Sequence, residues 1–392
     1  MTHVTAVPLP GPSSGQLPAP EPEPPFGYLD AVGGQPILPV ASTAWQAAAA
    51  QAWSDPARLH HAGRRAGLVL DAARASIAAS LGIRPAEVFF TSSGPTSVGI
   101  AIQGLLDAGS ERRVIASAVE SLAVLSPARR WASSLDLVPV SGTGQLDIGA
   151  FDSALAAPAG LACVQAANGE VGTRQPTAAA RALAQAHGVP LLVHAVQVIG
   201  RGAVPQDWDV LCASARDWGG PAGVGILAVR PAVRWRPDEN PDRGWVGGFP
   251  DIAGAAAAAT ALEYLQPNAE AEARRQFDLT ARIRAELPAC ATGIAVTGEP
   301  VDRLPHVVTF TCTGVTGEVL VQELDRRGIS VASGSACTSD TRMPSQVLEA
   351  MGIAGEASVR VSLPYGVTDA TVDAFLAALP DALLAARSGA GG

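Results

Sequence analysis

The feature that most constrains the fold is a regular alternation of short apolar runs with longer helical stretches, which begins near Phe26. The apolar runs have the length of buried strands and lie at 88–91, 113–116, 161–166, 190–193, 210–213 and 225–229. Stretches with apolar residues three and four positions apart lie at 64–80, 177–187 and 253–265. Such alternation is typical of a mostly parallel sheet covered by helices, so the sequence predicts an α/β fold.

The pattern changes after a long helical stretch that carries Arg and Glu at about 269–287. Strands are expected at 306–312, 329–332 and 358–362, and helices at 317–327, 344–351 and 369–386. A chain of 392 residues is long enough for two packed domains. We therefore expect a large domain at 26–265 and a smaller C-terminal α+β domain at 266–392, preceded by a disordered Pro-rich tail at 1–25.

The charge and the cysteine content exclude several classes of protein. The chain has 27 basic and 36 acidic residues, a net charge of −9, which argues against a nucleic-acid binder. The N-terminus does not have the pattern of a signal peptide, and we expect no membrane span and no metal site. The 5 cysteines show no close spacing, so a cytoplasmic protein without disulfides is expected.

All 27 basic residues are arginines, and the sequence contains no lysine. Lysine is normally among the commonest residues, so its absence from so long a chain is unusual. A coding bias toward Ala, Gly, Pro and Arg is one explanation, and protection from machinery that modifies lysine amines is another. Under either explanation, chemistry that needs a lysine amine is excluded.

Two loops stand out on physical grounds. The glycine-rich loop at 214–225 joins two predicted strands and permits a close backbone approach to a ligand, although a tight connection explains it equally well. The second loop, at 332–339, places Cys337 among small residues, where a thiol is accessible. An ordinary unreactive cysteine remains the alternative.

Together with other short motifs, these loops make the chain resemble the cysteine desulfurases of the class V aminotransferase family. The motifs follow in family order: YLD at 28–30, HAGRRA at 61–66, EVFFTS at 87–92, NGEVG at 168–172, the 214–225 loop, SGSAC at 333–337 and VRVSL at 359–363. Members of this family are homodimeric pyridoxal phosphate (PLP) enzymes of fold type I. They convert L-cysteine to L-alanine and leave the sulfur as a persulfide. The resemblance therefore implies a fold type I large domain and a smaller C-terminal domain.

The resemblance also shows what this chain lacks. The lysine that forms a Schiff base with PLP in the family corresponds to Asp217, and the histidine before that lysine corresponds to Arg216. Asp217 and Arg216 are expected to form a local ion pair. Covalent PLP attachment through a side chain is excluded, and the resemblance leads us to expect no cofactor at all.

Other family positions for the cofactor are altered. The aspartate that pairs with the pyridine nitrogen corresponds to His194, and the histidine that stacks on the ring corresponds to Ser121. Thr96 fits the phosphate-binding threonine only with a shift of one residue. The threonine that a partner subunit lends to the phosphate corresponds to Phe249. His194 is more simply read as a satisfied interior histidine than as a new acid or base.

Five positions match the family pattern: Asn168 and Gln197 on the oxygen side of the ring, Ser214 near the phosphate, Arg360 for the substrate carboxylate and Cys337 as the nucleophile that receives sulfur. A bidentate guanidinium suits a carboxylate. Each has a plainer alternative, because Asn168 could cap a turn, Arg360 could form a structural ion pair, and Cys337 could be idle.

Three functions remain open. The first is a pseudoenzyme, a dimeric scaffold or regulatory partner that pairs with itself or with an active paralogue. The second is a PLP-independent sulfur carrier that uses a Cys337 persulfide and passes sulfur to an acceptor protein. The third is an active desulfurase that holds PLP noncovalently.

Overall fold

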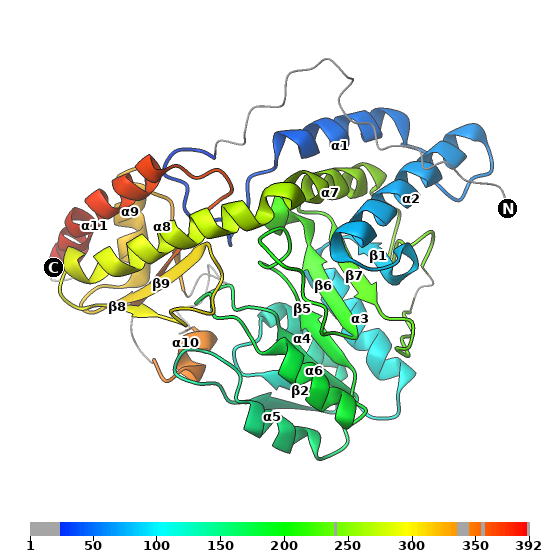
Figure 1. Cartoon of the computed structure of the whole chain (residues 1–392), viewed down its shortest axis with the longest axis horizontal. Helices are drawn as coiled ribbons and strands as arrows, with labels where there is room; N and C mark the ends of the chain where they lie inside the picture. The colour runs from blue at the N-terminus through cyan, green and yellow to red at the C-terminus, as the bar shows by residue number, and fades with distance from the viewer. Residues whose placement is uncertain (1–23, 239–240, 335–344, 354–356, 390–392) are drawn as a thin grey trace.

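The computed structural model describes residues 24–238, 241–334, 345–353 and 357–389. Within these residues the chain forms two sheets, each covered by helices (Figure 1). The prediction of an α/β fold with a mostly parallel sheet and a smaller C-terminal α+β part is confirmed. The predicted disordered tail at 1–25 lies almost entirely outside the described residues.

The larger sheet has the strand order β1-β7-β6-β5-β4-β2-β3. Its strands are β1 (Val88–Thr91), β2 (Arg113–Ser117), β3 (Ser134–Val138), β4 (Leu161–Gln165), β5 (Leu191–His194), β6 (Val210–Ser214) and β7 (Gly225–Val229). All neighbouring pairs are parallel except those of β7, which runs against both β1 and β6. Every residue of β4, β6 and β7 is buried, as expected for strands covered on both faces.

Helices cover both faces of this sheet because successive side chains of each strand point in opposite directions. Leu161 and Cys163 of β4 pack with α3 (Gly94–Ala108) and α4 (Leu122–Trp131). Ala162 and Val164 belong to the core on the other face. The helices of that core are α1 (Pro39–Gln51), α2 (His61–Leu81), α5 (Ile148–Leu155), α6 (Thr177–Ala186) and α7 (Ile252–Leu265).

The smaller sheet is antiparallel, in the order β10-β11-β9-β8. Its strands are β8 (Ile294–Thr297), β9 (Val307–Cys312), β10 (Ala332–Ser333) and β11 (Ala357–Ser362). Helices α8 (Ala269–Cys290), α9 (Gly317–Asp325) and α11 (Asp369–Gly389) share a separate apolar core with it, and α10 (Gln346–Ala350) lies apart from that core. The domain boundary predicted at 265/266 falls between α7 and α8 and stays a prediction.

An N-terminal segment joins this smaller sheet, more than 300 residues away in sequence. Tyr28 and Asp30 form parallel bridges with Ser330 and Ser362. The amide of Leu29 donates to the carbonyl of Ser330 at 2.8 Å, and the amide of Ser362 donates to the carbonyl of Leu29 at 2.8 Å. The two ends of the described chain are therefore held in one structural unit (Figure 1).

Some elements differ from the sequence-based expectations. The expected strand at 329–332 is shorter, because Ser330 pairs with Tyr28 and only Ala332–Ser333 joins β11. The pattern did not reveal β3, an edge strand whose side chains are mostly half-buried or exposed. It also did not reveal α3, whose first residues are Gly94 and Pro95.

Candidate functional site

The carboxyl ends of β5 and β6 bring several of the expected site residues together. His194 ends β5, Ser214 ends the neighbouring parallel strand β6, and Asp217 follows in the short helix η2 (Ala215–Trp218). The carboxyl edge of a parallel sheet is where ligands bind in folds of this type. We call His194, Ser214 and Asp217 the strand-end cluster.

Asp217 is the central buried charge of this cluster, with 3% of its surface exposed. Gln197 Nε2 donates to its Oδ1 at 3.1 Å, and Arg216 Nε lies 4.0 Å from the same oxygen. The expected ion pair with Arg216 is therefore present at the limit of contact. Oδ2 of Asp217 has no partner among the described residues. Burial raises the pKa of Asp217 to about 6, against the opposing charges of Arg216, His194 and Arg201.

Gln197 links Asp217 to a second buried group, His306. The backbone of Gln197 is left-handed, with φ 73°, a conformation that favours glycine. The Gln197 amide nitrogen donates to Asp217, so its Oε1 accepts from His306 Nε2 at 3.0 Å. Burial, together with the charges of nearby arginines, lowers the pKa of His306 well below its usual value, so the ring is neutral with its proton on Nε2.

His194 faces a carboxylate that the sequence analysis missed. His194 Nδ1 lies 3.6 Å from Glu120 Oε1, and both side chains are buried. The other oxygen of Glu120 accepts from the amide of Gln165 at 2.9 Å. The reading of His194 as an interior histidine agrees with this burial, although its role stays a prediction. No sequence signal links Glu120 to His194, because the contact depends on how β2 and β5 are placed in the sheet.

The first turn of α3 lies beside Ser214. A Cβ on Gly94 would be 2.8 Å from the Cβ of Ser214, so only glycine permits this approach. Ser93 caps the helix by accepting from the amide of Thr96 at 3.1 Å, and the hydroxyls of Ser93 and Thr96 lie 2.7 Å apart. The buried hydroxyl of Ser214 has no partner among the described residues. The positive end of a helix dipole thus lies next to an unsatisfied hydroxyl.

Two of the altered positions have other surroundings. Ser121 caps α4 by accepting from the amide of Ala123 at 3.0 Å, so this side chain stabilises a helix end. Phe249 has 65% of its surface exposed in the loop before α7. Among the described residues, no hydrogen bond joins either side chain to the strand-end cluster.

The matching residues Asn168 and Arg360 lie in a second group, which we call the turn-side cluster, with Asp30 as its third member. Asn168 Nδ2 donates to the Val119 carbonyl at 3.1 Å, and its Oδ1 accepts from the amides of Glu170 and Val171 at 2.8 and 2.9 Å. Arg360 Nη2 donates to Asp30 Oδ1 at 2.9 Å. Both side chains therefore have partners within the protein, while Arg360 Nε has none among the described residues, and the roles of both residues stay predictions.

Asp30 and Glu170 were not named from sequence as functional side chains, although both lie within quoted motifs. Glu170 is partly buried near Arg360, and its buried Oε1 has no partner among the described residues. Burial raises the pKa of Glu170 to about 7, against a hydrogen bond from Ser345 and the charge of Arg360. Cys337 lies outside the described residues, so its placement stays a prediction.

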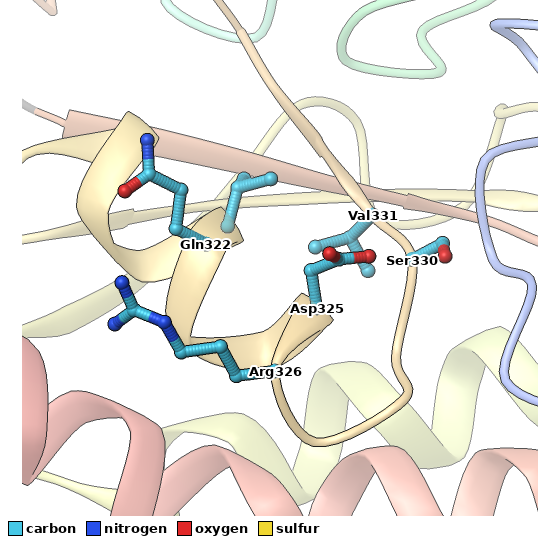
Figure 2. Close-up of a pocket in the computed structure, with 6 residues that line it drawn as sticks. Gln322, Asp325, Arg326, Ser330 and Val331 are labelled. Carbon is cyan, nitrogen blue, oxygen red and sulfur yellow. The ribbon is translucent and has the colours of Figure 1, made fainter.

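A surface hollow lies elsewhere, between α9 and the segment that leads into β10. Figure 2 shows the residues around it, which are Val321, Gln322, Asp325, Arg326, Ser330 and Val331. None of them belongs to either cluster, so this hollow is separate from the candidate site.

Two other kinds of feature, a metal site and a membrane span, are absent from the described part of the chain. No group of three or more His, Cys, Asp or Glu side chains is placed to hold a metal ion. No helix formed by the described residues is long and apolar enough to span a membrane.

Comparison with known proteins gives matches over most of the chain. Residues 28–375 match the family model Aminotransferase class-V. The chain is 33% identical over 390 residues to the IscS-like cysteine desulfurase of Mycobacterium tuberculosis, covering 93% of this chain and 98% of that protein. It is 33% identical over 349 residues to the cysteine desulfurase NifS of Azotobacter vinelandii, covering 84% and 85%.

Solved structures agree with these matches. A NifS-like protein superposes with a TM-score of 0.82 at 25% identity, covering 92% of this chain and 99% of that one. A NifS-like protein from Rickettsia africae has the same fold, with a TM-score of 0.82 at 21% identity.

These matches correct the expectation that the chain has no cofactor, which is wrong. Residues 28–375 match a family whose enzymes use PLP, and the relatives are cysteine desulfurases. We therefore expect this site to bind PLP. A lysine provides a covalent link but is only one of several contacts to the cofactor, so its absence does not exclude PLP binding. The sequence still excludes a link to a lysine side chain.

The residues present fit PLP only in part. The unpaired hydroxyl of Ser214 beside the first turn of α3 suits a phosphate. The carboxylate of Asp217 does not suit the aldehyde end, because it supplies neither an amine nor a proton donor when ionised. The fit is therefore good at the phosphate end and poor where the family has its lysine.

Proposed function

The chain belongs to the aminotransferase class-V family, and from that premise we propose that it is a cysteine desulfurase-like protein without lysine-dependent chemistry, acting as a dimeric pseudoenzyme, scaffold or regulatory partner. The observation that carries the proposal is the buried aspartate at position 217, in a chain that contains no lysine. PLP is expected to be held noncovalently.

The replaced residues affect the family's reaction more than its fold. When PLP is bound in this family, it withdraws electrons from the substrate, and a lysine moves the protons. Asp217 is held by Gln197 and is more acidic than a lysine amine, even with its pKa raised to about 6. His194, paired with Glu120, replaces the carboxylate that would favour a protonated pyridine ring.

Exposed apolar side chains support a dimer. Trp45 of α1, Trp53 in the following turn, and Leu59 and Leu68 at α2 are exposed, as is Phe249 before α7. Helices α1 and α2 both pack on α7, so the elements that carry most of these side chains are neighbours. Grouped apolar residues of this kind mark interaction surfaces. We propose that the partner is a second copy or an active paralogue.

The remaining finer points are also proposals. The cytoplasm is the proposed location, since none of the four described cysteines forms a disulfide. The sulfur-carrier alternative depends on Cys337, which lies outside the described residues, and an acceptor protein is expected only in that case.

The test is alanine release. We would incubate the full-length protein with PLP and L-cysteine and measure L-alanine, with the M. tuberculosis relative as a positive control. We expect no release above a blank without protein. Sustained release that depends on the protein would overturn the proposal.

The variant Asp217→Lys provides a matched control. We expect it to become covalently labelled with PLP after borohydride reduction, seen by mass spectrometry, because an amine is restored at that position. Release of alanine should still be far below that of the positive control, since His194 and Ser121 are unchanged. Full activity from this single change would show that the other positions matter little.

A further inference from the structure

Buried polar atoms without partners gather around the strand-end cluster. They are Ser214 Oγ, Asp217 Oδ2 and Glu120 Oε1, each lacking a hydrogen bond within the described residues. Because Glu120 Oε1 lies 3.6 Å from His194 Nδ1, Ser214 Oγ and Asp217 Oδ2 are the two atoms that most need a hydrogen-bond partner. A buried polar group without a partner is destabilising, and a bound ligand with complementary groups removes that cost.

The chemistry of Asp217 determines which complementary group fits. Its Oδ1 already accepts from Gln197, and its Oδ2 is shielded from solvent with no hydrogen-bond partner among the described residues. An ionised carboxylate only accepts hydrogen bonds. The aldehyde oxygen of PLP also only accepts, so the two would repel each other, whereas an ammonium group supplies both positive charge and donors.

The length of the side chain supports an amine at this place. The carboxylate oxygen of an aspartate ends two bonds short of the point that a lysine nitrogen reaches. An amine nitrogen of the ligand at that point would lie about one charge-assisted hydrogen bond, roughly 2.8 Å, from Asp217.

The opposite end of the site suits an anion. Ser214 Oγ is buried and free to donate, and it lies beside the first turn of α3, a helix of 15 residues. Backbone amides at such a helix end favour phosphate. The two ends together match a ligand that carries both a phosphate and an ammonium group.

We infer that the site binds the amine form of the cofactor, pyridoxamine 5′-phosphate, in preference to PLP, with Asp217 accepting from its ammonium group. This inference rests on the proposed function, because a site with an amine-bearing cofactor and no lysine is not set up for desulfuration. Asp217 thus determines cofactor specificity.

The test compares three ligands by isothermal titration calorimetry on the full-length protein. The ligands are pyridoxamine 5′-phosphate, PLP and pyridoxine 5′-phosphate, whose neutral hydroxyl replaces the amine. We expect pyridoxamine 5′-phosphate to bind at least about tenfold more tightly than either of the others, as one charge-assisted hydrogen bond provides. Equal or tighter binding of PLP would overturn the inference.

Two variants distinguish the effect of the Asp217 charge from a general loss of ligand binding. Asp217→Asn keeps the acceptor for Gln197 but removes the charge, so it should lose the preference for the amine while PLP binding is maintained. Ser214→Ala should weaken all three ligands alike, because it acts on the phosphate. An unchanged ligand preference in Asp217→Asn, with melting showing a folded protein, would contradict the assignment.

A free α-amino acid is the other source of an ammonium group. L-alanine is therefore titrated in parallel, and we expect no binding at concentrations that saturate with pyridoxamine 5′-phosphate. Binding of L-alanine without binding of the phosphate ligand would refute the inference. Alanine release from cysteine would refute the proposed function instead, so the two failures are distinguishable.

Discussion

The strand-end cluster and the turn-side cluster differ in how the protein treats their polar groups. In the turn-side cluster, where residue types match the family, Asn168 makes three hydrogen bonds and Arg360 is paired with Asp30, and only Arg360 Nε is buried without a partner among the described residues. In the strand-end cluster, where Asp217 and His194 depart from the family, Ser214 Oγ has no partner among the described residues, and Asp217 Oδ2 has none either. A residue that matches the family pattern therefore does not by itself show that the family's chemistry is retained. A residue that departs from the pattern does not show that the protein's own side chains fill the site.

The largest expected effect is on the free energy of unfolding, when one buried side chain from each cluster is replaced by alanine. Asn168→Ala should lower the free energy of unfolding by about 3 kcal/mol, because it removes three hydrogen bonds and leaves backbone groups buried without partners. Ser214→Ala should raise it by about 1 kcal/mol, because it removes a buried hydroxyl that has no partner among the described residues. Urea unfolding of both variants provides the measurement. Equal losses would remove the distinction between the clusters.

The second effect depends on pH and concerns Asp217. Its pKa rises from 3.8 to about 6 on folding, so the folded state holds its proton more tightly and loses stability as pH increases from about 4 through 6. The variant Asp217→Asn should not lose this stability as pH rises, because an asparagine side chain does not ionise. The variant should match the wild type near pH 4 and be more stable by about 2 kcal/mol at pH 8.

Thermal or urea unfolding at several pH values tests this directly. The control is Asp136→Asn, an aspartate on edge strand β3 whose side chain is 45% exposed. Between pH 4 and pH 8 this variant should show no gain in stability over the wild type, because the Asp136 carboxylate is exposed and paired with Arg113. A pH-independent difference for Asp217→Asn would indicate that burial of its charge is not costly.

The smallest effect concerns the ion pair of the turn-side cluster. Arg360 and Asp30 keep 13% and 26% of their side chains exposed, so solvent screens part of their attraction. A double-mutant cycle with Arg360→Gln and Asp30→Asn should give a coupling energy of about 1 kcal/mol. A coupling near zero would leave Arg360 available for a substrate carboxylate and weaken the comparison.

The sequence predicted the fold well because its main signal is local. Apolar runs such as 88–91 and 225–229 coincide with β1 and β7, and the helical period at 253–265 coincides with α7. Edge strand β3 escaped detection because its side chains are only partly buried. Helix α3 escaped because its start at Gly94-Pro95 resembles a turn.

The site was predicted only at the level of residue types. Motif order placed Asp217, His194 and Arg360 at functional positions, but not the groups that each contacts. The partners of Arg360 and His306 are Asp30 and Gln197, 330 and 109 residues away in sequence. Such contacts follow from the packing of the two sheets and carry no local signal. They determine whether a side chain is free for a ligand.

The pairing of Tyr28 and Asp30 with Ser330 and Ser362 has a consequence for biosynthesis. The smaller sheet cannot be completed until residue 362 has left the ribosome, because the N-terminal segment binds strands made last. Residues 28–30 therefore have no partner strand during nearly the whole of translation, and Leu29 stays exposed in the nascent chain. Contacts so distant in sequence slow folding. A deletion that removed residues 28–31 should impair the C-terminal end of the protein, although the large sheet could still assemble during synthesis.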